Sequence, residues 1–137
     1  MAVKCYRDLT VWQRAMELVV SSYALASALP RSELYGLSSQ LKRAAISVPA
    51  NIAEGHGRMH IGDYMRHLSI ARGSLMELET HVLLAERLSF IEAGQSQTAL
   101  GLSAEISRML AVLLIKLRVR RSGLVTRPSP LNPSPST

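Results

Sequence analysis

The feature of the sequence that most constrains the fold is a long apolar repeat. Between about Ile61 and Leu88, apolar residues alternate at intervals of four and three over three heptads: Tyr64, Leu68, Ala71, Leu75, Leu78, Val82 and Ala85. This spacing lines one side of an α-helix. It predicts one long helix whose apolar stripe must be covered by other helices.

A first helix is predicted from about Thr10 to Leu29, because Thr10 and Gln13 have capping-box spacing and Pro30 follows as a stop. Two neighbouring apolar rows follow this helix, one of Trp12, Met16, Val19, Tyr23 and Ala26, the other of Val11, Ala15, Leu18, Ser22 and Leu25. Together the rows make a wider face than a seam between two helices requires.

A second helix is predicted to begin near Ser32 and to end at the Gly55-His56-Gly57 run. Its stripe consists of Leu34, Leu37, Leu41, Ala44 or Ala45, Val48 and Ile52. Pro49 lies inside it, and because proline removes a backbone donor, a kink or restart is expected near Val48.

A fourth helix is predicted from Ser89 to about Arg121, since Ser89 and Glu92 have capping-box spacing. Its second half, Met109 to Leu117, is apolar nearly all round, which predicts burial on more than one side. Beyond it, Pro128, Pro130, Pro133 and Pro135 are separated by small polar residues. Residues 1–121 are therefore expected to form the bundle domain, and residues 122–137 a Pro-rich disordered tail.

Composition supports an all-α protein in one domain. The chain has 137 residues, 47% of them hydrophobic and only 4% aromatic. Its one cysteine, Cys5, excludes an intrachain disulfide and fits a reducing compartment. The longest uninterrupted apolar run, Met109 to Ile115, is far shorter than the roughly 20 residues of a membrane span. We therefore expect a cytoplasmic protein without membrane contact.

Four amphipathic helices with short connections pack most simply as an up-down-up-down four-helix bundle. The double apolar row of the first helix and the apolar half of the fourth exceed what one small bundle covers. We expect a homo-oligomer, because exposed apolar patches usually mark interfaces. An oversized monomer core is the alternative.

No arrangement of residues indicates an enzyme. The Glu-x-x-His motif of di-iron bundles is absent, as are nucleophile-elbow and phosphate-loop motifs. His56 and His60 are four residues apart, but glycines flank His56 and the metalloprotease glutamate is missing. His67 and His81 are interpreted as surface or interface histidines. We expect no catalytic residue, no metal site and no cofactor.

A polar row follows the second helix beside its apolar stripe. Its members are Gln40, Arg43, Ser47, Asn51 and Glu54, at spacings of three and four, and the third helix offers Glu77 and the small pair Gly73-Ser74. We expect a partly buried network in which Arg43 meets Glu77, Asn51 reaches backbone freed at Pro49, and the small pair admits another helix. Its role is either packing specificity, which we favour, or a binding groove.

Several sequence blocks resemble the four-helix-bundle family of 23S ribosomal RNA intervening-sequence proteins. The most specific block is S-V-P-A-N-I-A-E-G, residues 47–55, and the similarity covers about Tyr6 to Leu117. The other blocks are D-L-T-V-W-Q-R-A (8–15), Q-L-K-R-A-A (40–45) and I-A-R-G-S-L-M-E-L-E-T (70–80).

The resemblance implies a left-handed bundle that assembles into a homopentamer and has no enzymatic activity. It also implies similarity to accessory bundle proteins of diversity-generating retroelements, which bind nucleic acid and a reverse transcriptase. The Gly- and Ser-containing start of the fourth helix and the Pro-rich tail depart from the family pattern.

The net charge of +6 is concentrated near the C-terminus. From Met1 to Ile106, ten basic and ten acidic residues cancel, whereas Ser107 to Thr137 has six basic residues and no acidic one: Arg108, Lys116, Arg118, Arg120, Arg121 and Arg127. These cations predict RNA or DNA binding through phosphates, with little stacking because aromatic residues are scarce there.

Two alternatives to nucleic-acid binding remain at this stage. The cations simply complement the negative end of the fourth helix's dipole. Otherwise, the oligomer is a scaffold for a protein partner, acidic or engaged in nucleic-acid processing, and does not bind nucleic acid itself.

Overall fold

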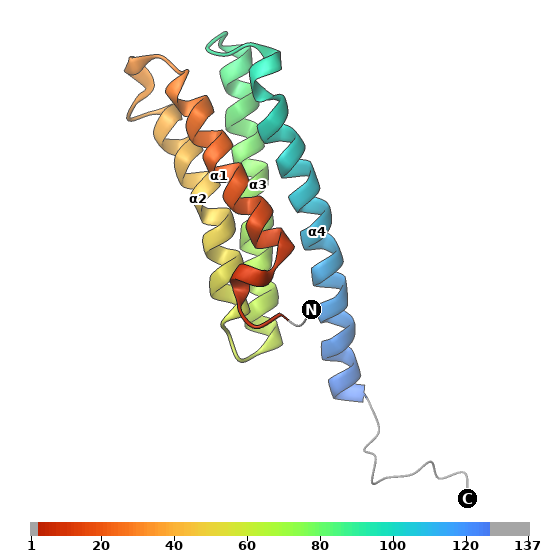
Figure 1. The fold of residues 1–137 in the computed structure, drawn as a ribbon. Helices are drawn as coiled ribbons and strands as arrows, with labels where there is room; N and C mark the ends of the chain where they lie inside the picture. Colours follow the sequence, from red (N-terminus) through yellow and green to blue (C-terminus); the bar gives the residue numbers. More distant parts are fainter. Residues whose placement is uncertain (1–2, 127–137) are drawn as a thin grey trace, which may run out of the picture.

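Four α-helices account for most of the computed structural model, which describes residues 3–126. Their bounds are α1 Thr10–Ser27, α2 Leu37–His56, α3 Ile61–Arg87 and α4 Ala93–Thr126, and the described residues contain no strand. Two 3₁₀ turns, η1 (Tyr6–Asp8) and η2 (Arg31–Glu33), precede α1 and α2. Successive helices run in opposite directions, and α1 and α3 each pack against both α2 and α4 (Figure 1). The all-α prediction is confirmed.

One of the two apolar rows of α1 forms its core side. Ala15, Leu18 and Ser22 have no exposed surface, whereas Met16 and Tyr23 of the other row are 44% and 43% exposed. Ala26 of that other row is buried and Trp12 and Val19 pack partly against the core, so Met16 and Tyr23 are the members that the single chain leaves uncovered.

The helix α2 begins later than its sequence pattern predicts and continues unbroken through Pro49. Residues 31–33 form η2 instead of the first turn of the helix, and Leu34 is 49% exposed. The expected restart near Val48 does not occur. A proline has a backbone φ that suits a helix, so Pro49 removes one backbone hydrogen bond without ending α2.

The start of α4 differs from the prediction because Ser89 ends α3 rather than capping α4. Ser89 has a φ of 61°, the left-handed conformation typical of a residue just after a helix. Its N–H donates to the Glu86 carbonyl and the Phe90 N–H to the Ala85 carbonyl, both at 2.9 Å. The cap of α4 is instead the side chain of Gln95, which accepts from the Glu92 N–H at 2.8 Å.

The far half of α4 extends past the ends of the other helices (Figure 1). It is buried on one side only, where Leu110, Leu114 and Leu117 pack, while Val112, Ile115 and Val119 are 52%, 56% and 67% exposed. The expectation that this half is buried on several sides is therefore wrong for the single chain.

In the part of the chain that the structure describes, α4 alone is long and apolar enough to cross a membrane, judged by length and composition. A core helix of a soluble protein meets the same criterion, and α4 packs along α1 and α3. The helix ends at Thr126 rather than near Arg121, so residues 122–126 are helical; the remainder of the predicted tail, 127–137, lies outside the described residues.

Candidate nucleic-acid interface

The predicted cations of α4 are all exposed, and three of them lie near the first turns of two other helices. Arg108 and Lys116 line a groove of about 360 Å³ together with Leu9 and Thr10, at the start of α1. On the other side of α4, Arg121 Nη1 lies 3.6 Å from the position that a Cβ on Gly62 would take, at the start of α3. The remaining two cations of this set are Arg118 and Arg120. The end of α4 thus lies between the starts of α1 and α3.

The antiparallel order of the helices changes the charge balance that the linear sequence suggests. The starts of α1 and α3 and the ends of α2 and α4 lie at the same end of the bundle (Figure 1). We call residues 3–17, 52–68 and 105–126 the basic end; they contain ten basic and five acidic residues. The other described residues, 18–51 and 69–104, contain five of each. The excess of positive charge in the described chain therefore lies entirely in one half of the bundle.

Three of the five acidic residues of the basic end form ion pairs with two arginines. Arg14 approaches Glu17 at 3.0 Å and Glu105 at 3.4 Å, and Arg58 approaches Glu54 at 2.7 Å. Among residues 3–126, none of the other eight cations of this end pairs with a carboxylate, and all eight are exposed: Lys4, Arg7, Arg66, Arg108, Lys116, Arg118, Arg120 and Arg121.

The aromatic rings of the basic end pack against neighbouring side chains. Tyr6 and Trp12 meet edge to face with their centroids 5.3 Å apart, and the Arg7 guanidinium lies 5.8 Å from the Tyr6 centroid. Tyr64 is half-buried, which raises the pKa of its hydroxyl, and its ring meets His56 edge to face at 5.7 Å. All of these rings are partly buried, so none offers a fully exposed ring on which a nucleic-acid base can stack.

The single cysteine also lies at this end. Hydrogen bonding from Arg7 lowers the pKa of the Cys5 thiol and raises the pKa of the Arg7 guanidinium. Cys5 therefore contributes negative charge at a lower pH than an ordinary cysteine.

A polar network runs between α2 and α3, and it contains part of the predicted set. The hydroxyls of Ser47 and Ser74 are 2.7 Å apart. The Asn51 side chain donates to the Ser47 carbonyl at 2.9 Å and to the Ser47 hydroxyl at 3.0 Å. Its oxygen accepts from His67 Nδ1 at 3.0 Å, so Asn51 links the two helices. Because the Asn51 nitrogen is used by Ser47, this arrangement requires the proton on His67 Nδ1.

Two predicted contacts of this network do not form. Arg43 and Glu77 line one polar hollow of about 310 Å³ but make no ion pair, and Glu77 instead lies 3.6 Å from His81 Nε2. Both side chains are exposed, so water competes with the pairing. Asn51 bonds the carbonyl of Ser47, whereas the donor that Pro49 lacks would have served the carbonyl of residue 45, one helical turn earlier. Glu54 pairs with Arg58.

His67 is part of this network, contrary to its interpretation as a surface or interface histidine. It is 4% exposed, and its Nε2 makes no hydrogen bond; the nearest carboxylate oxygen, Glu54 Oε1, is 3.9 Å away. The signal was present in the sequence, because His67 precedes Ala71 by four residues and therefore lies on the core side of α3.

The helices α2 and α3 approach closely at Gly55, whereas Gly73 of the predicted small pair faces open space. A Cβ on Gly55 would lie 2.8 Å from the Cβ of His67 and 3.1 Å from Cδ1 of Tyr64. A Cβ on Gly73 would meet nothing within 4 Å. Gly55 thus allows the two helix backbones to come close enough for the bond between Asn51 and His67.

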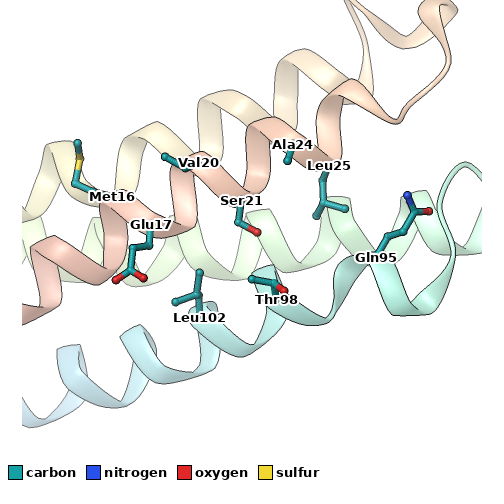
Figure 2. Close-up of a pocket in the computed structure, with 9 residues that line it drawn as sticks. All are labelled: Met16, Glu17, Val20, Ser21, Ala24, Leu25, Gln95, Thr98 and Leu102. Atoms are coloured by element: carbon teal, nitrogen blue, oxygen red, sulfur yellow. The ribbon is translucent and has the colours of Figure 1, made fainter.

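An open groove of about 770 Å³ separates α1 from the first half of α4 (Figure 2). Figure 2 shows Leu25 and Leu102 lying toward this space from the two helices. Val20, on the α1 side, is 72% exposed. The other residues that line the groove are Met16, Glu17, Ser21, Ala24, Gln95 and Thr98. Of the two apolar rows of α1, only Met16 and Leu25 line the groove, so it lies beside the wide apolar face of α1.

Within residues 3–126, no group of three or more His, Cys, Asp or Glu residues is placed to hold a metal ion.

Comparison with known proteins identifies the family. The family model of the 23S rRNA-intervening sequence protein matches residues 7–112. The chain belongs to this family. A solved structure from the S23 ribosomal protein family of Bacteroides thetaiotaomicron VPI-5482, described as a protein with unknown function, is similar to the chain with a TM-score of 0.72 and 25% sequence identity. The similarity covers 77% of this chain and 98% of that one. No match was found among curated proteins.

Proposed function

We propose that this member of the 23S rRNA-intervening sequence protein family is a non-catalytic, homo-oligomeric bundle that binds nucleic acid through the phosphate groups. The observation that carries the proposal is the basic end, where eight exposed cations have no carboxylate partner among the described residues. Cations that neutralise phosphates release counterions, which gives affinity without sequence readout. The RNA in the family's name makes structured RNA the first probe.

The helix dipole does not account for this charge. Lysine and arginine are favoured near the C-terminus of a helix, which suits Arg118, Arg120 and Arg121. However, Lys4 and Arg7 precede α1, where the dipole is positive and disfavours cations, and Arg66 lies in the second turn of α3, far from the negative end of that helix. The positive ends of two helices and a surplus of cations thus lie together at the basic end of the bundle. An anionic partner would stabilise this arrangement, because it offsets their positive charge.

Self-association is supported by uncovered apolar surface on two helices. The groove lies between α1 and the first half of α4, and Val112, Ile115 and Val119 form an exposed stripe on the second half of α4. Contact with a second copy of the chain would remove this apolar surface from water, which favours assembly. Native mass spectrometry gives the subunit count, and a monomer at all concentrations would refute this part of the proposal.

The test of nucleic-acid binding is fluorescence anisotropy with a labelled RNA hairpin at rising salt. We expect affinity to fall steeply with salt, and truncation after Leu117 to reduce the slope of log K against log salt by about 4, because it removes Arg118, Arg120, Arg121 and Arg127. The triple variant R118Q/R120Q/R121Q, which keeps the helix and Arg127, should reduce the slope by about 3. No binding, or binding that neither salt nor these variants change, would refute the proposal.

A protein-interaction scaffold is the second candidate, and the open groove beside Val20 favours it. A protein partner would be retained when the oligomer is purified from lysate treated with nuclease, whereas a partner held through RNA or DNA would be lost. We place either activity in the cytoplasm, away from membranes.

A further inference from the structure

We propose that the basic end binds the double-helical form of a nucleic acid, and that Arg7 and Arg66 take part in binding together with the α4 arginines. This inference rests on the proposed function and specifies its ligand and its extent. It begins from the topology, which places segments distant in sequence around the end of α4 (Figure 1).

Arg66 joins the α4 cations on the α3 side. It follows Gly62 by one helical turn, so both residues face the same side of α3. The guanidinium of Arg121 lies beside Gly62, and Arg118 precedes Arg121 by three residues on α4. Arg66 is exposed and has no carboxylate partner among residues 3–126.

Arg7 extends the same surface on the α1 side. It lies in η1, directly before Leu9 and Thr10, which share a groove with Lys116 and Arg108. Its guanidinium is exposed over the Tyr6 ring. The cations therefore come from three segments, and they surround the end of the bundle instead of following one helix.

Two features favour a duplex over a single strand. Single-strand binding relies on aromatic rings that stack on bases, but Tyr6, Trp12 and Tyr64 of this end pack on neighbouring rings or are half-buried. A duplex carries about one phosphate charge per 1.7 Å of its axis, twice that of one strand. Cations spread over several segments neutralise such a ligand by charge alone, and the rigid backbone of a duplex requires no ordering of bases.

Two labelled probes are titrated with the full-length protein at about 100 mM salt. One is an RNA duplex of about 20 base pairs, and the other is one of its strands, chosen to be unstructured. We expect the duplex to bind at least about tenfold more tightly than the single strand. R7Q and R66Q should each weaken duplex binding by about three- to tenfold and lower the salt slope by about 1.

Matched controls come from the half of the bundle in which charges balance. The control variants are Arg72→Gln and Arg31→Gln. Arg72 lies on the same helix as Arg66, Arg31 lies in a 3₁₀ turn as Arg7 does, and both residues are exposed. These two variants should bind like the unmodified protein. Thermal melting of each variant checks that it folds.

The outcomes separate the two proposals. If the single strand binds as tightly as the duplex, the duplex preference is wrong. If R7Q and R66Q bind like their controls while R118Q/R120Q/R121Q loses affinity, the composite surface is wrong and the proposed function stands. If neither probe binds, or no variant changes binding, both fail.

Discussion

The structure predicts opposite effects on stability for the same substitution at two glycines, Gly55 and Gly73. Both lie inside helices, where alanine is favoured over glycine by about 1 kcal/mol. At Gly73 the new methyl group would meet nothing within 4 Å. Gly73→Ala should therefore raise the free energy of unfolding by about 0.5–1 kcal/mol, close to the full difference in helix propensity.

At Gly55 the methyl group meets atoms that cannot turn aside. It would lie 2.8 Å from the Cβ of His67 and 3.2 Å from the carbonyl oxygen of Tyr64, whereas ordinary contact begins at 3.4 Å. The helices must separate by about 0.6 Å at the first of these contacts, the difference between 3.4 and 2.8 Å. Overpacking of this kind costs about 1–3 kcal/mol, and stretching the 3.0 Å bond from His67 to Asn51 adds about 1 kcal/mol.

After subtraction of the gain in helix propensity, Gly55→Ala should lower the free energy of unfolding by about 1–3 kcal/mol. The assay is urea unfolding followed by circular dichroism, at one protein concentration because assembly shifts apparent stability. Gly101→Ala, on α4 and also without contacts within 4 Å, is a second control. If Gly55→Ala stabilises the protein as much as the two controls do, the close approach of α2 and α3 at Gly55 is wrong.

Three further predictions concern single contacts. Ser89→Gly should stabilise the protein by about 1 kcal/mol in the same assay, because Ser89 has a φ of 61° that glycine adopts without strain; no change or a loss would contradict the left-handed helix end. Asn51→Ala should destabilise it by about 1–3 kcal/mol, since His67 Nδ1 then keeps a buried proton without an acceptor; a neutral result would argue against the network. Alkylation of Cys5 by iodoacetamide should reach half its maximal rate at a lower pH than alkylation of glutathione, and Arg7→Gln should move that midpoint upward, because Arg7 lowers the pKa of the thiol; identical midpoints would exclude the Arg7 contact.

The sequence predicts most accurately the helices that carry a long regular apolar repeat. The third helix was expected over about 61–88 and spans Ile61–Arg87. Here each turn buries the same kind of side chain, so packing and local preference agree over the whole length.

Helix boundaries were less predictable, because residues that cap helices serve other turns as well. Serine at 89 has the spacing of an N-cap, yet it ends α3 through backbone bonds that no side-chain pattern reveals. Ser32 likewise lies in η2, and α2 begins only at Leu37. In both places, several short conformations satisfy the same polar residues, and the packing of the adjoining helices selects one.

The sequence predicts the residues that α2 contributes to the polar network, but it does not predict which residues of α3 they bond. Ser47 and Asn51 were found from their spacing, but a spacing rule does not show which residues of a second helix lie opposite. The register between α2 and α3 depends on the approach at Gly55, a property of two backbones. His67 was therefore recognised only from the structure.

The basic end and the uncovered apolar stripe share α4, so the two parts of the proposed function are physically coupled. Lys116 lies between Ile115 and Val119 in sequence, and Arg108 is one turn before Val112. A second copy that buries this stripe brings the cations of two chains together, and their repulsion opposes assembly at low salt. A bound phosphate backbone relieves that repulsion, and by linkage each event strengthens the other. Salt should thus promote assembly of the free protein while it weakens nucleic-acid binding, and assembly that salt does not promote would argue against a shared role of α4 in both surfaces.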